Sequence, residues 1–98
     1  MEIEFSHDDL DRLELDAAFS SKWAQAIVKI YRRRMQQIRA ARDERDFYAL
    51  KSLHFEKLQG QRSHQHSMMI NDQFRLIIEI LGEAPNKRVK VVSIEDYH

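Results

Sequence analysis

Apolar and polar residues alternate most regularly over residues 73–81, QFRLIIEIL, a stretch without Gly or Pro. Side chains of a β-strand point alternately to its two faces, so one face is apolar throughout: Phe74, Leu76, Ile78 and Ile80. The opposite face carries Arg75, Ile77, Glu79 and Leu81. The pattern predicts a central strand that helices cover on its apolar face, with the functional residues on the half-open face.

Further strands are predicted on both sides of this central one. A turn signal at Asn71-Asp72 lets residues 64–70 pair with it, and residues 88–94 return beside it after Pro85. Residues 2–5 also alternate and predict a short strand at the edge of the sheet. We therefore expect a three-stranded antiparallel meander with an added edge strand.

The length of the first turn decides which side chains meet. With a two-residue loop, Met68 lies opposite Arg75, so that His64 and His66 share the face of Arg75 and Glu79. This register predicts two imidazoles beside the strand arginine.

Two helices are predicted before the strands. Ser6 is the expected N-cap of a short helix over residues 7–17, which has acidic residues in its first turn. A longer helix is expected from Ser20-Ser21 to about Ala41, and its apolar stripe is typical of a core face. That stripe consists of Trp23, Ile27, Ile30, Tyr31, Met35 and Ile38. The order β-α-α-β-β-β predicts an α+β fold of two layers, a helical hairpin packed on a small, mainly antiparallel sheet.

Length and composition narrow the class of protein. Ninety-eight residues suit a single domain over residues 1–98 with one modest core. The chain has no cysteine for disulfides or thiolate metal sites, which fits a reducing cytoplasm. No signal peptide is apparent, and no apolar stretch approaches the roughly 20 residues of a membrane span. We expect a cytoplasmic protein without membrane contact.

Charge is unevenly distributed although the formal net charge is zero. Residues 1–16 hold seven acidic residues against Arg12 alone, a net charge of −6, so residues 17–98 carry +6. Within the latter a basic run is formed by Lys29, Arg32, Arg33, Arg34, Arg39, Arg42 and Arg45. The run is either a solvated helix surface paired with the acidic start or an electrostatic footprint for phosphates, and charge alone leaves both open.

Side chains able to move protons or bind phosphate lie in the second half of the chain. His54 and Lys57 precede a bend, Arg62 follows it, and the chain ends with Asp96-Tyr97-His98. If the last strand pairs with the central one, this end approaches Arg75, and imidazoles, a phenol, a carboxylate and cations converge there.

Each of these residues also has a structural interpretation. His54 could be a partly buried histidine with satisfied hydrogen bonds, and residues 97–98 could be a frayed tail. His64 and His66 could form a metal pair, although further ligands at a suitable spacing are missing.

Three segments together resemble a known family. They are LHFEKLQGQR at residues 53–62, HSMMINDQFRLIIEI at 66–80 and VVSIEDYH at 91–98. They resemble the HigB-type toxins of bacterial type II toxin–antitoxin modules, within the RelE/ParE superfamily. The terminal Asp-Tyr-His, at this distance from the strand that bears Arg75, is the most specific part of the resemblance. The family often has an aromatic residue where this chain has His66, and its loop is usually more basic and richer in Gly than residues 61–67.

The resemblance implies cleavage of messenger RNA in the ribosomal A site, without metal or other cofactor, and neutralisation by a helix-turn-helix antitoxin of the HigA type. Operator DNA would be bound only through the toxin–antitoxin complex. The catalytic residues carried over from the family are His54, Lys57, Arg75, Asp96, Tyr97 and His98. The RNA-binding residues assigned beside them are Arg62, His64 and His66.

Metal-free RNA cleavage needs a base for the ribose 2′-OH, an acid for the leaving 5′-oxygen and cations for the charge that develops on phosphorus. Histidine serves as acid or base because its unperturbed pKa is about 6.5, and Lys57 and Arg75 would supply the cations. Tyr97 could stack on a base or orient a phosphate oxygen, and Asp96 could fix a histidine tautomer. Which histidine is base and which is acid stays open.

Two other classes of function stay open at this point. One is a non-enzymatic inhibitor of DNA gyrase, as ParE-type toxins are. The other is an interaction module whose basic helix binds an acidic partner.

Overall fold

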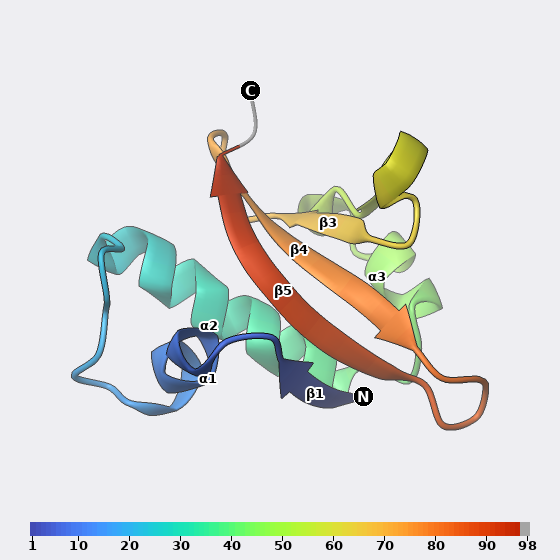
Figure 1. The fold of residues 1–98 in the computed structure, drawn as a ribbon, viewed down its shortest axis with the longest axis horizontal. Coiled ribbons are helices and arrows are strands. Elements are labelled where there is room, and N and C mark those ends of the chain that lie inside the picture. Colours follow the sequence, from blue (N-terminus) through green and yellow to red (C-terminus); the bar gives the residue numbers. More distant parts are fainter. Residues whose placement is uncertain (97–98) are drawn as a thin grey trace.

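The computed structural model describes residues 1–96, in which helices cover one face of a five-stranded mixed sheet (Figure 1). The elements are β1 (Glu2–Phe5), α1 (Asp8–Leu15), α2 (Gln25–Ala40), α3 (Arg45–Ala49), the 3₁₀ helix η1 (Lys51–Leu53), β2 (Glu56–Lys57), the 3₁₀ helix η2 (Gly60–Arg62), β3 (His66–Met69), β4 (Phe74–Leu81) and β5 (Arg88–Asp96). The strand order is β1-β5-β4-β3-β2, with β1 parallel to β5 and the other pairs antiparallel. The predicted α+β fold is confirmed.

The hydrophobic core lies between α2 and the apolar face of the sheet, as the alternation in β4 predicts. Leu76 and Ile78 of β4 are fully buried in one cluster with Tyr31, Met35 and Ile38 of α2. The remaining buried members of the cluster are Leu10, Leu13, Ile27, Val28, Ala41, Phe47, Leu53, Phe55, Met68, Ile70, Val89 and Val91.

The two helices begin later than predicted. Helix α1 has His7 at its N-cap position, and the Ser6 hydroxyl donates instead to the carbonyl of Val92 at 2.6 Å, so the predicted Ser6 cap is wrong. Helix α2 begins at Gln25, and Trp23 precedes it. The rings of Trp23 and Phe74 pack edge to face, with 5.3 Å between the centroids. Trp23 therefore joins the core from a loop.

The predicted register of β3 against β4 is wrong by one residue. Met69 pairs with Arg75, and His66 pairs with Ile78 on the core side of β4. The cause is a wider turn, in which the Asn71 side-chain oxygen accepts the backbone N–H groups of both Gln73 and Phe74. Because a one-residue shift moves every side chain to the other face, His66 does not share the face of Arg75.

Most of the basic run is paired within the protein. The Arg39 guanidinium forms two bonds to the Glu14 carboxylate, at 2.7 and 2.9 Å, and Arg32 donates to carbonyls at and after the end of α1. Arg34 is buried and donates to the carbonyl of Met69 at 2.8 Å. Arg42 and Arg45 pair with Asp46 and Asp43 respectively. This self-pairing favours the interpretation of the run as a helix surface over that of a phosphate footprint.

The Tyr31 hydroxyl provides a test of the core. It is fully buried and donates to the carbonyl of Leu10 at 2.7 Å, and burial together with the acids of α1 raises its pKa. Tyr31→Phe removes this buried hydrogen bond and should lower the free energy of unfolding by about 0.5–1.5 kcal/mol. Urea unfolding checks this, with Tyr48→Phe as the exposed control, which should change stability by less than about 0.5 kcal/mol. Equal effects of the two substitutions would contradict the packing described here.

Candidate active site

Arg75 lies at the start of β4, on the face of the sheet opposite the core cluster. Its neighbour Ile77 on the same face is 1% exposed and Arg75 itself is 7% exposed. In the sheet Arg75 pairs with Glu95 of β5 on one side and Met69 of β3 on the other. The strand that the sequence places at the centre thus carries a buried cation on its non-core face.

One nitrogen of the Arg75 guanidinium connects three segments of the chain. Arg75 Nη2 donates to the hydroxyl of Ser67 at 2.8 Å and, more weakly, to the Ser67 carbonyl at 3.4 Å. It also donates to the backbone carbonyl of His54. Strand β4, strand β3 and the segment that follows η1 therefore meet at this side chain.

His54 follows η1 in a backbone conformation that is rare for a residue with a side chain. Its φ is 44° and its ψ is 51°, the left-handed region, which costs a non-glycine residue about 1–2 kcal/mol. Its neighbours Leu53 and Phe55 are both buried in the core, whereas the His54 side chain is exposed. The core thus anchors the backbone on both sides of a solvent-facing imidazole.

A polar network covers the rest of this face. The Arg62 guanidinium makes two bonds to the Glu95 carboxylate, at 2.8 and 2.9 Å, and a third to the side-chain oxygen of Gln65 at 2.9 Å. Gln65 donates in turn to Glu79 at 3.1 Å, and Ser93 donates to Glu95 at 2.7 Å. The guanidinium of Arg62 lowers the pKa of Glu95. The loop that carries Arg62 is thereby fastened to β4 and β5 beside Arg75.

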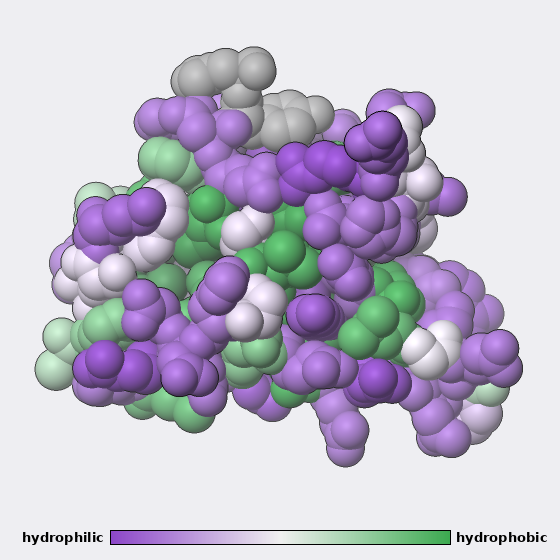
Figure 2. Space-filling view, viewed as in Figure 1, coloured by the Kyte–Doolittle hydropathy of each residue, from purple (hydrophilic) through white to green (hydrophobic). Residues whose placement is uncertain are grey.

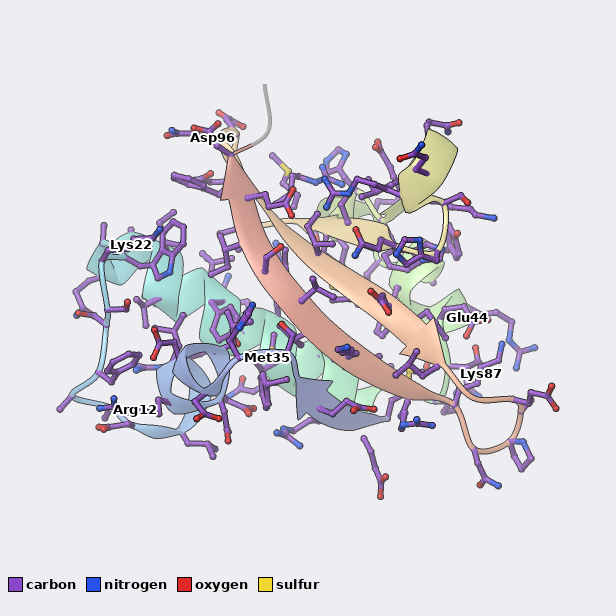
Figure 3. All side chains as sticks on the ribbon, viewed as in Figure 1. Arg12, Lys22, Met35, Glu44, Lys87 and Asp96 are labelled. Carbon is purple, nitrogen blue, oxygen red and sulfur yellow. The ribbon has the colours of Figure 1, made fainter. Side chains whose placement is uncertain are left out.

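The end of β5 lies at the same end of the sheet. Asp96 pairs with Phe74 and accepts a bond from the Gln73 side chain at 3.1 Å. Figure 3 shows Asp96 at the tip of β5, far from the Glu44–Lys87 ion pair at the other end of that strand. Figure 2, viewed as Figure 1, shows hydrophilic residues over most of the visible surface, with hydrophobic residues between them. Tyr97 and His98 lie outside the described residues.

The other predicted site residues are less closely tied to Arg75. Lys57 is exposed on the short strand β2 and pairs with His66. The His64 imidazole is exposed, with Nε2 at 3.9 Å from the Glu79 carboxylate. His66 lies on the core side of the sheet, stacked on Phe55 with 4.8 Å between the ring centroids. Within residues 1–96 no group of three or more His, Asp or Glu side chains is placed to hold a metal ion.

His66 occupies an environment that disfavours its charged form. Burial, and secondarily the nearby Lys57, lower the pKa of its imidazole, and Glu44 opposes this. Its Nδ1 is buried and has no hydrogen-bond partner among residues 1–96. The geometry is that of an aromatic side chain packed on Phe55.

Comparison with known proteins identifies the family. A family model described as the RelE-like toxin of the type II toxin–antitoxin system HigB matches residues 3–98. The chain belongs to this family of HigB-like toxins. Since a type II toxin is neutralised by a protein, family membership implies a protein antitoxin as partner.

A solved structure supports the fold of this HigB-like toxin. The YoeB/ParE toxin from Agrobacterium tumefaciens superposes with a TM-score of 0.60 over 100% of both chains, at 14% sequence identity. Identity this low carries the fold and no residue roles. No curated protein sequence matches the chain. Among the helices of residues 1–96, none combines the length and apolar character that crossing a membrane requires.

Two residues of the site carry no signal in the sequence of this HigB-like toxin. Ser67 is a serine within a strand, and Glu95 is one of several acids near the end of the chain. Only the observed register shows that Ser67 lies on the face of Arg75, two pairs along the ladder, and that Glu95 is the sheet partner of Arg75. With the correct turn length, the alternation of β3 would have placed Ser67 on the face of Arg75.

The lowered pKa of His66 predicts a pH effect on stability. Between that pKa and the ordinary value of about 6.5, the unfolded chain binds more protons than the folded one, so stability falls as the pH falls. His66→Phe keeps the aromatic stack and removes the titrating group. The loss of urea stability from pH 7.5 to 5.5 should therefore be smaller in His66→Phe than in the wild type, whereas the exposed-site control His7→Phe should match the wild type. Identical losses in all three proteins would show that His66 does not titrate as described.

Proposed function

We propose that this HigB-like toxin is a ribosome-dependent endoribonuclease that inhibits translation by cleaving messenger RNA through acid–base chemistry. The observation that carries the proposal is the bond from the buried Arg75 guanidinium to the backbone of the exposed His54, beside the end of β5. The backbone of His54, which would supply a proton-transferring side chain, is thereby bonded to a buried cation near the end of β5.

His54 would act as one of the two proton-transfer groups of the reaction. Its imidazole faces solvent while its backbone is anchored by two buried neighbours and by Arg75. Because the backbone is already anchored, less orientational freedom is lost when substrate binds. Correct orientation of reacting groups supplies a large part of catalysis. His98, Tyr97 and Asp96 remain the proposed source of the second proton-transfer group, of a stacking ring and of a tautomer-fixing carboxylate.

The cations of the site would differ in role. Lys57 is exposed three residues after His54, within a short strand, and is available to a phosphate. Arg75 is bonded to the protein through Nη2 and would contribute its positive charge from a fixed position. Arg62 is held by Glu95, so a phosphate would have to compete with that carboxylate for it. His64 stays an exposed candidate for RNA contact, and His66 is the weakest of the three assigned to that role.

The proposed partners follow from the proposed activity. The substrate is messenger RNA on the ribosome, and the protein antitoxin is of the helix-turn-helix HigA type, through which operator DNA is bound. The proposed compartment is the cytoplasm, where ribosomes and messenger RNA occur. The reaction as written requires no cofactor.

The test replaces His54 by a residue that lacks the imidazole but can still adopt the left-handed backbone conformation. Asn tolerates the left-handed region better than most residues, so His54→Asn should keep the fold. Loss of an acid–base group lowers the rate by about 10²–10⁴-fold. Cleavage of messenger RNA on programmed ribosomes by the purified protein should therefore fall by this factor in His54→Asn and stay unchanged in the control His7→Asn, which alters an exposed histidine at the start of α1.

Two results would contradict the proposal. One is a wild-type protein that cleaves no RNA on ribosomes, and inhibition of DNA gyrase by that protein would then support a ParE-like role. The other is a folded His54→Asn variant that cleaves as fast as the wild type.

A further inference from the structure

Ser67 is a fully buried polar residue in the middle of a strand. It lies in β3 between Glu56 of β2 and Ile77 of β4, and its side chain is 0% exposed. A buried hydroxyl costs free energy unless it is hydrogen-bonded, and serine is not a residue that strands favour. Its hydroxyl accepts a hydrogen bond from Arg75 Nη2 at 2.8 Å.

The position of Ser67 fixes the direction of the Arg75 side chain. Ser67 pairs with Ile77, two residues along β4 from Arg75, so both side chains project from the same face and meet diagonally. Each terminal guanidinium nitrogen carries two hydrogens. With one hydrogen of Nη2 directed at the Ser67 hydroxyl, the other is directed at the carbonyl of His54.

The second of these bonds acts on the strained residue. His54 is left-handed at φ 44°, and its own N–H donates to the carbonyl of Lys51 at 3.1 Å. A non-glycine residue keeps this conformation only where its surroundings hold it. The Arg75 bond to the His54 carbonyl is one such hold, and it depends on the orientation that Ser67 gives to the guanidinium.

We infer that Ser67 is a positioning residue: through Arg75 it holds His54 in the left-handed conformation that presents the His54 imidazole. This inference rests on the proposed function for its catalytic consequence. The structural part of the inference can be tested independently of the proposed function, because the backbone conformation of His54 can be measured in the isolated protein.

The experiment compares Ser67→Ala with Ser67→Thr, which retains a hydroxyl. In Ser67→Ala the amide and ¹³Cα resonances of His54 should move toward the values of a right-handed or extended residue. In ribosome-dependent cleavage, kcat should fall about 10- to 100-fold, the effect of misplacing a reacting group by about 1 Å, with KM changed less than about twofold. Ser67→Thr should restore both readouts toward the wild type. Ser20→Ala, in the loop before α2, is the control and should change neither.

The outcomes separate this inference from the proposed function. A wild type that cleaves no RNA overturns the proposed function, and the His54 resonances then decide this inference alone. A folded Ser67→Ala with His54 resonances and kcat as in the wild type overturns it. Loss of stability alone, with unchanged His54 resonances below the unfolding transition, also overturns it. If Ser67→Ala does not fold, Ser67→Cys, close to serine in size and a weaker acceptor, is judged by the same readouts.

Discussion

The burial of the Arg75 guanidinium is the constraint on which the proposed active-site end of this molecule depends. Arginine keeps its charge at any physiological pH, so a buried guanidinium must find acceptors inside the protein. Among them here are the hydroxyl and carbonyl of Ser67 and the carbonyl of His54. The chain after η1 must therefore return to β4 for the sheet to form with Arg75 inside it, and that return sets His54 beside the strand.

The two ends of the sheet have different roles in this arrangement. At one end Arg75, the Arg62–Glu95 ion pair and Asp96 lie together next to His54. At the other end the Glu44–Lys87 ion pair joins the start of α3 to the β4–β5 hairpin. The helices are held by the apolar face and by arginines bound to carboxylates and carbonyls. The proposed chemistry is thus confined to one corner, and six further ion pairs lie elsewhere in residues 1–96.

The sequence predicts what depends on periodicity and misses what depends on one residue of turn length. The apolar face of β4 and the core stripe of α2 follow from alternation and from three- and four-residue steps, and both belong to or pack against the core cluster as predicted. The register of β3 depends on how the Asn71 side chain closes its turn. That single feature moves His66 to the core side and Ser67 to the face of Arg75. The family resemblance locates His54 and Arg75, but a backbone bond between them has no sequence signal.

The most direct measurement is a double-mutant cycle on the rate of ribosome-dependent cleavage, with Ser67→Ala, Arg75→Ala and the double variant. If Ser67 acts only by orienting Arg75 against His54, the double variant should be no slower than Arg75→Ala alone, since the hydroxyl has no role once the guanidinium is gone. Fold losses that multiply in the double variant would mean that the two residues act independently and would contradict a site organised around Arg75. A wild type without cleavage would contradict it at the outset.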